Sequence, residues 1–222
     1  MKQPSARRSE PRPRYYSREQ LDELCERIIF DFCTERYGQE LMPVPTEALL
    51  QLLEQHAGDV DQLAELPPGV HGVTLYYWDR RPSVQIDARL TRQHWRETRR
   101  RSTITHECSH VIQHAPLWRA LGPEDSGEGP VAQACRGEEV EESAERWDDW
   151  MEWQARYMSG AMLMPKSRVC RLVQKFARDK GLEVPLQAGT PSSLYLVEHA
   201  IIAFHVSRDA AMVRLKQLGL IA

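Results

Sequence analysis

Residues 103–114 combine the side chains that metal-dependent hydrolysis requires. His106 and His110 are four residues apart, and Glu107 directly follows the first histidine. On a helix, residues four apart project from one face a turn apart, so both imidazoles can reach a single ion. Glu107 lies about 100° further round, where its carboxylate can take a proton from a water on that ion. Two neutral imidazoles suit zinc, so the segment predicts a zinc site with a general base beside it.

The same segment carries an apolar side that would fix it against a core. Four apolar residues lie on the side away from the histidines: Ile104, Cys108, Val111 and Ile112. Burial of that side would leave the histidines facing either a cleft, as a metal site requires, or water. A surface helix that happens to carry two histidines is therefore the competing interpretation.

A catalytic zinc ion generally takes three protein ligands and a water. His114 continues the four-residue spacing, but it lies too far along and around the helix to share one ion with His106. We expect His114 to have a structural or supporting role. From residue 121 to 152 the chain has 11 acidic and two basic residues, which supply carboxylate candidates.

Four of these acidic residues share one face of the helix expected there: Glu145, Asp148, Asp149 and Glu152. Spacing favours Glu152 slightly, because the small Ala155 follows one turn later and would let this helix approach the motif helix closely. A solvated acidic face is the alternative.

Helices and a hairpin are predicted before the motif. Ser17 with Gln20 can form a capping box for an amphipathic helix that ends near Gly38. Thr46 can cap a second helix, which ends near His56.

Residues 72–78 are rich in strand formers and residues 83–87 alternate apolar and polar side chains, so the two segments predict a β-hairpin. Thr91 can cap a helix that runs, continuously or with one break, through the motif to His114. A free strand edge beside this helix could bind an extended peptide.

After the motif, residues 116–137 are expected to form a loop, because Gly and Pro interrupt them repeatedly. An apolar stripe predicts a long helix from about residue 140 to 162, and helices at 167–179, 193–204 and 208–218 follow. We therefore expect an α+β, mostly helical, zincin-like domain over residues 17–222, with a small β-sheet beside the motif helix. Residues 1–16 are expected to be a disordered basic arm.

Three segments occur in a specific order: residues 106–110, 152–155 and 162–165. They resemble the His-Glu-x-Gly-His, Glu-x-x-Ala-Asn and Leu-Leu-Met-Pro patterns of the ImmA/IrrE family of zinc metallopeptidases. Weaker similarities extend from about residue 40 to the end of the chain. Four positions depart from the family pattern: Ser109, Arg156, Met158 and Met162.

The resemblance implies that His106, His110 and Glu152 bind zinc (Zn2+) and that Glu107 is the catalytic base. It implies a zinc-dependent endopeptidase that hydrolyses a peptide bond in a protein substrate, often a transcriptional repressor in this family. Arg156 occupies the position where the family has Asn, one turn beyond Glu152. A side chain at this position could change the orientation of Glu152 or the access of substrate to the site. Tyr157 and the arginines are the candidates for stabilising the oxyanion.

The end of the chain supports a different interpretation. The helices at 193–204 and 208–218 are joined by a short turn, as in a helix-turn-helix, and the second carries Arg208, Arg214 and Lys216. The protein would then be a DNA-binding regulator with a structural zinc site. A zinc-stabilised interaction domain without activity is a third hypothesis. Arg99, Arg100 and Arg101 could also contact nucleic acid, although salt bridges within the protein are favoured.

The amino-acid composition limits the class of protein and the cellular compartment. The 222 residues, 41% of them hydrophobic, suit one domain with a substantial core, and the net charge is −3. Five cysteines without a Cys-x-x-Cys pair indicate a reducing, cytoplasmic setting. No segment approaches 18 consecutive apolar residues, and no apolar segment follows the basic N-terminus, so we expect neither a membrane span nor a secretory signal.

Overall fold

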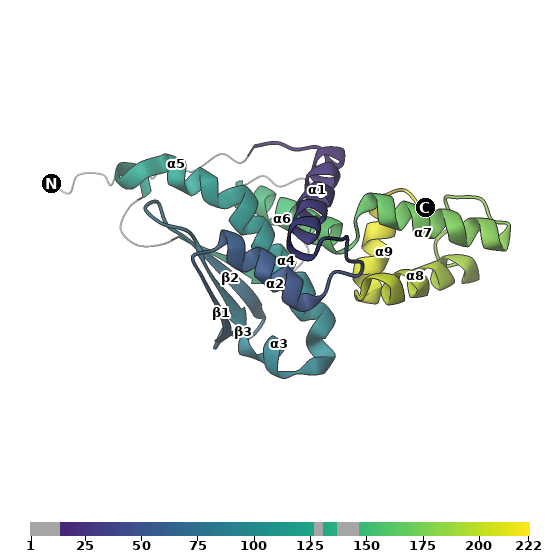
Figure 1. Ribbon diagram of the computed structural model, residues 1–222, viewed down its shortest axis with the longest axis horizontal. Helices are drawn as coiled ribbons and strands as arrows, with labels where there is room; N and C mark the ends of the chain where they lie inside the picture. The colour runs from purple at the N-terminus through teal and green to yellow at the C-terminus, as the bar shows by residue number, and fades with distance from the viewer. Residues whose placement is uncertain (1–13, 127–130, 137–146) are drawn as a thin grey trace.

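The computed structural model describes residues 14–126, 131–136 and 147–222. Over these residues the fold is α+β and mostly helical, with a small sheet beside the motif helix, as the sequence predicts. The sheet and the helices α7–α9 lie at opposite ends of the molecule, with α1, α2, α4 and α6 between them (Figure 1).

The first two helices follow the predicted positions. Helix α1 (Arg18–Tyr37) begins at the Ser17–Gln20 capping box and ends at Gly38, whose φ of 69° is the left-handed conformation that glycine tolerates. Helix α2 spans Thr46–His56, but its N-cap is Pro45. Thr46 was therefore wrongly predicted as the cap: its hydroxyl hydrogen-bonds Glu97 instead.

Four strands form the sheet in the order β1-β3-β2-β4. The predicted hairpin is present as β2 (Val70–Tyr76) and β3 (Ser83–Asp87), which are antiparallel. Strand β1 (Asp59–Ala64) pairs in parallel with β3, and β4 (Val131–Arg136) pairs antiparallel with β2. Strand β2 lies beside the motif helix and is paired on both sides, with β3 and with β4. It therefore has no free edge for an extended peptide along the segment that pairs with β4.

The motif lies in a helical run with two irregular turns. Helix α3 (Ala88–Arg92) is followed by the 3-10 turn η1 (His94–Arg96), helix α4 (Glu97–Ser109), the π-helical turn η2 (His110–His114) and helix α5 (Ala115–Ser126). The expected break is therefore present, and it lies before α4.

Two predictions around this run are wrong. Thr91 does not cap a helix, because Asp87 caps α3 and the Thr91 hydroxyl donates to the Gln62 carbonyl. The expected loop at residues 116–137 contains α5 and β4. Pro116 does not end the helical run: α5 follows η2 without a gap, and the proline lies directly after the π-helical turn.

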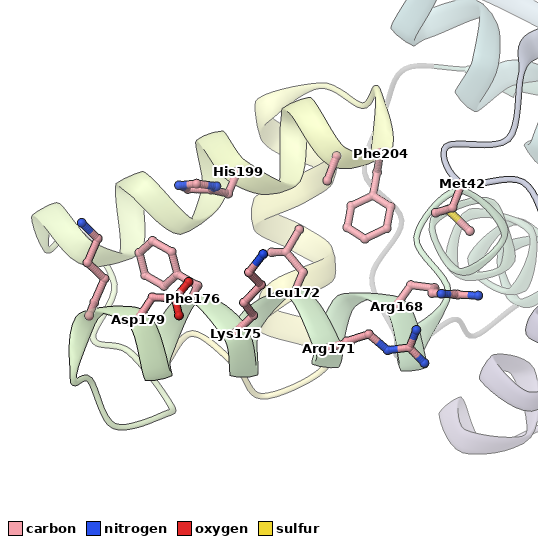
Figure 2. Close-up of a pocket in the computed structure, with 11 residues that line it drawn as sticks. Met42, Arg168, Arg171, Leu172, Lys175, Phe176, Asp179, His199 and Phe204 are labelled. Atoms are coloured by element: carbon pink, nitrogen blue, oxygen red, sulfur yellow. The ribbon is translucent and has the colours of Figure 1, made fainter.

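The chain ends in four helices: α6 (Trp147–Leu163), α7 (Lys166–Lys180), α8 (Pro191–Phe204) and α9 (Arg208–Gln217). Thr190 and Ser207 cap the last two through side-chain hydrogen bonds. A cavity of about 540 Å³ lies between α7 and α8, with an apolar floor that includes Leu172 and Phe176 and a largely basic rim (Figure 2). Its lining includes none of the predicted zinc ligands.

One large hydrophobic cluster joins the helices and the sheet. Ile104, Cys108 and Val111 are buried in it, so the predicted apolar side of the motif helix is confirmed. None of the helices in the described part of the chain combines the length and the apolar character that crossing a bilayer requires.

Candidate metal centre

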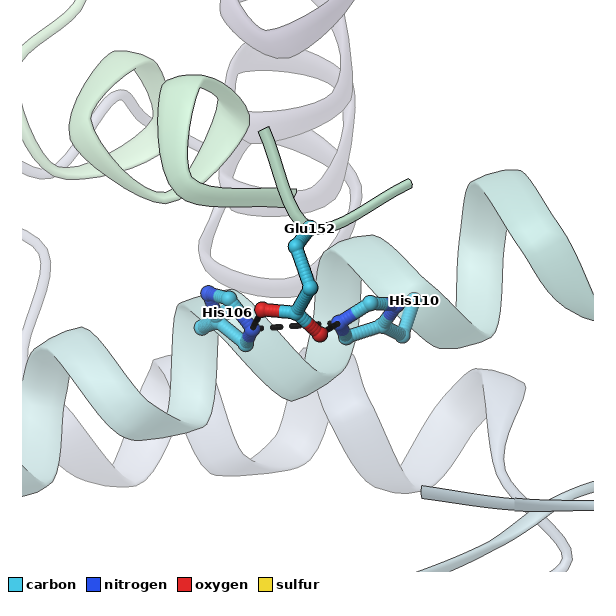
Figure 3. Close-up of side chains that lie close together, drawn as sticks. All are labelled: His106, His110 and Glu152. Atoms are coloured by element: carbon cyan, nitrogen blue, oxygen red, sulfur yellow. Dashed lines mark hydrogen bonds and ion pairs between the residues drawn. The ribbon is translucent and has the colours of Figure 1, made fainter. Parts of the chain in front are cut away.

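Three side chains from two helices converge on one buried point. The candidate ligand atoms of His106, His110 and Glu152 all lie within 4.8 Å of one another, and all three residues are buried. The two Nε2 atoms are 3.0 Å apart, and the Glu152 oxygens are 3.3 Å from His106 Nε2 and 3.0 Å from His110 Nε2. Figure 3 shows the carboxylate reaching between the two imidazoles from a separate helix.

This arrangement suits a cation. A tetrahedral ion with bonds of 2.0–2.2 Å separates its ligand atoms by about 3.3 Å, close to the observed spacing. At this distance the lone pairs of two neutral imidazole nitrogens would repel each other and the negative carboxylate. A positive charge between the three groups removes this repulsion. The group could therefore hold a metal ion, as was predicted for these three residues.

A hydrogen-bonded chain fixes the orientation of His110. Its Nδ1 lies 3.0 Å from His114 Nδ1, and His114 Nε2 lies 3.1 Å from Gln154 Oε1. The Gln154 amide group then donates to the Arg14 carbonyl over 2.8 Å. Since Gln154 Oε1 can only accept, His114 carries its proton on Nε2 and accepts from His110 Nδ1–H. This tautomer leaves the His110 Nε2 lone pair facing Glu152, as a metal ligand requires.

His114, for which we expect a structural or supporting role, contacts His110 within the π-helical turn η2. Burial, followed by the nearby charge of His110, lowers the pKa of His114 to about 3, so its imidazole is neutral at ordinary pH. A neutral ring is what the hydrogen-bonded chain needs.

Helix α6 places Glu152 by packing closely across α4. Ala155 is fully buried, which agrees with the predicted close approach, and Ser159 and Thr105 join the two helices through hydroxyls 2.7 Å apart. Burial alone would raise the pKa of Glu152, but positive charge at the histidines that face it outweighs burial and holds that pKa well below its usual value. A cation bound between neutral imidazoles would act on the carboxylate in the same direction. The carboxylate is therefore ionised and ready to bind a cation.

Glu107 lies beside the ligand group and outside it. It is fully buried, and its Oε2 accepts a hydrogen bond of 2.6 Å from the Thr74 hydroxyl on β2. Its Oε1 has no hydrogen-bond partner among the described residues. Burial raises the pKa of this carboxyl, and the neighbouring histidines lower it by less. A buried carboxylate with a raised pKa and one unused oxygen is a suitable proton acceptor.

The contribution of β2 was not predicted. Gly72 leaves room for Glu107, and Thr74 and Tyr76 project from the same face of the strand. Because successive side chains of a strand point to opposite faces, the sequence shows that these three residues share a face. It does not show which face of the strand packs on the motif helix.

A cleft of about 380 Å³ reaches His106, one of the three candidate ligands. His106 lines it, together with Arg99 and Ser102 from α4 and Arg156 and Ser159 from α6. Arg156, one of the four positions that depart from the ImmA/IrrE pattern, therefore lines the same cleft as His106.

The other candidate residues from the sequence analysis are not part of the ligand group. The Tyr157 hydroxyl donates to Asp22 over 3.0 Å, so it is already engaged away from the ligand group. Arg101 is buried and donates to the Val44 carbonyl, and Arg100 lies 3.7 Å from Glu97. The side chains of Glu145, Asp148 and Asp149 are outside the described residues, as are residues 1–13 of the expected arm.

Comparison with known proteins found no protein-family model that matches the chain, and no curated protein with significant similarity to it.

Proposed function

We propose that this protein is a zinc-dependent endopeptidase, and that the resemblance to the ImmA/IrrE metallopeptidases reflects its function. The observation that carries the proposal is the position of Glu107 beside the His106, His110 and Glu152 group. A structural zinc site needs only ligands, whereas hydrolysis also needs a base next to an open ligand position. Three protein ligands leave that fourth position.

Each side chain has a distinct task in this mechanism. Zinc, when bound, would polarise the scissile carbonyl and acidify a water. Thr74 holds one oxygen of Glu107, and the other oxygen takes the proton as water attacks the peptide. The raised pKa of Glu107 lets it keep that proton and then deliver it to the leaving nitrogen.

The cleft supports a peptide substrate. Its lining mixes polar and apolar side chains, comes from α4, α6 and the α9 region, and includes His106. A transcriptional repressor is the substrate that the family resemblance suggests. The geometry supports a protein chain without selecting which one.

DNA binding is less well supported. Arg214, one of the three basic residues on the candidate recognition helix, is buried and paired with Asp22 at 2.7 Å. Arg208 is paired with Glu198. A recognition helix needs its basic side chains free to reach the groove and the phosphates.

The first test is the metal content of purified wild type, Glu152→Ala and Glu107→Gln after removal of metal with a chelator and dialysis against zinc. We expect about one zinc per chain in wild type and in Glu107→Gln, and little in Glu152→Ala. A wild type that takes up no zinc would contradict the proposal.

The second test separates a peptidase from a zinc-stabilised binding domain. Wild type and Glu107→Gln are incubated with lysate of the source cells, and new protein N-termini are compared by mass spectrometry. Neo-N-termini made by the wild type alone support hydrolysis. Identical N-termini in both samples, with zinc bound, would favour the domain without activity.

A further inference from the structure

Tyr76 has a buried hydroxyl without a hydrogen-bond partner. The residue ends β2 and is 2% exposed, and its hydroxyl has no partner among the described residues. A buried polar group left unpaired costs about 1–3 kcal/mol, so most such groups are paired. Phenylalanine would fill the same space without this cost. The hydroxyl therefore calls for an explanation beyond packing.

The strand places this hydroxyl on the side of the metal centre. Side chains two apart on a strand share a face, and Gly72, Thr74 and Tyr76 all project from the buried face of β2. Gly72 lies against Glu107 and Thr74 hydrogen-bonds it. Tyr76 is the next side chain in this row, about 7 Å further along.

The packing around the ring places it next to the second ligand helix as well. Tyr76 forms a small buried cluster with Met151, the neighbour of Glu152, and with Ala115 and Trp118. Its ring stacks on Trp118 with the centroids 5.5 Å apart. Burial, and then the charges of Glu107 and Glu152, raise the pKa of Tyr76 well above its usual value. The phenol thus stays protonated within the electrostatic reach of both carboxylates.

We propose that the Tyr76 hydroxyl is a catalytic hydrogen-bond donor to the oxyanion that forms when water adds to the scissile carbonyl. This role rests on the proposed peptidase function. The carboxylates of Glu107 and Glu152 disfavour new negative charge nearby, so a neutral donor beside them is needed. Because the hydroxyl has no partner among the described residues, its donor capacity is available to an oxyanion.

The test compares Tyr76→Phe with Tyr77→Phe as the control. The Tyr77 hydroxyl lies 3.2 Å from Ser83 Oγ, and the half-buried residue directly follows the end of β2. The probe is an N-acetyl dipeptide phosphonate, whose tetrahedral anionic group imitates the oxyanion. Its binding to the zinc-loaded proteins is measured by calorimetry, beside zinc content and melting temperature.

We expect Tyr76→Phe to bind the phosphonate about 10- to 100-fold more weakly, as loss of one oxyanion donor does. Its zinc content should equal that of wild type, and its melting temperature should be equal or higher because no hydrogen bond is lost. Tyr77→Phe should bind the phosphonate as wild type does. Once a cleaved substrate is identified, Tyr76→Phe should lower kcat with little change in KM.

Two results would overturn this role while leaving the peptidase proposal intact. One is phosphonate affinity within about twofold of wild type in Tyr76→Phe. The other is a clearly lower melting temperature, which would assign the hydroxyl a structural bond. A wild type that binds no zinc, or binds zinc but no phosphonate, would instead contradict the peptidase proposal and this role with it.

Discussion

The carboxylate of Glu107 lies directly against the backbone of Gly72. A methyl group on residue 72 would fall 2.5 Å from Glu107 Oε1 and 2.9 Å from Cδ, closer than such atoms approach in proteins. Thr74, two residues further along β2, donates to Oε2. The strand therefore bounds the space of the candidate base on one side, and a larger residue at position 72 would require Glu107 to move.

Gly72→Ala should displace Glu107 and lower proteolytic activity by about 100-fold, since a misplacement of about 1 Å can cost that much. Zinc content should not change, because residue 72 does not contact the ligand group. The free energy of unfolding should fall by about 1–3 kcal/mol through overpacking. Activity against an identified substrate, zinc content and urea unfolding measure the three effects.

The matched control is Gly160→Ala in α6, where an added methyl group meets no atom within 4 Å. It should raise stability by up to about 1 kcal/mol, because alanine is the better helix former. Unchanged activity in Gly72→Ala would mean that the exact position of Glu107 is unimportant, and would count against its role as base.

His114→Phe should weaken zinc binding by about 10- to 100-fold, as loss of a group that orients a metal ligand commonly does. The new ring fills the space of the imidazole but cannot accept the proton on His110 Nδ1, which lies 3.0 Å from His114 Nδ1. Competition with a fluorescent zinc chelator measures the affinity. His199→Phe makes the same substitution at an exposed position on α8 and should leave affinity unchanged. Equal zinc affinity in the two variants would refute the supporting role.

The sequence predicted the parts of the site that depend on helical spacing. His106, Glu107 and His110 follow from residue positions along one helix, and the small Ala155 correctly indicated a close helix pair. Spacing could not separate Glu152 from the acidic residues sharing its face, because all of them satisfy the same periodicity. The choice depended on the family resemblance.

Other features depend on contacts that no local pattern contains. The π-helical turn η2 widens the helix at His110, and its geometry follows from packing of the whole run. Strand β4 forms by pairing with β2, about 60 residues earlier, while its own segment is flanked by Gly and Pro. Residues 72–78 were predicted as a strand from their composition, but the contact of Gly72 and Thr74 with the motif helix could not be predicted.

A buried ion pair joins the two ends of the chain. Arg214 on α9 is 1% exposed, and it lies 2.7 Å from Asp22 on α1 and 3.1 Å from the Met164 carbonyl. Tyr157 on α6 donates to the other Asp22 oxygen. This network connects the candidate DNA-binding helices to the helix that carries Glu152.

Asp22→Asn should therefore destabilise the protein by about 3–5 kcal/mol, because it leaves a buried guanidinium without its counter-charge. Urea unfolding followed by circular dichroism measures the loss. Arg208→Ala is the control: it breaks an exposed pair with Glu198 and should cost no more than about 1 kcal/mol. If Asp22→Asn cost as little as Arg208→Ala, Arg214 would not depend on Asp22. The contact with the Met164 carbonyl would then be sufficient to hold the buried guanidinium in place.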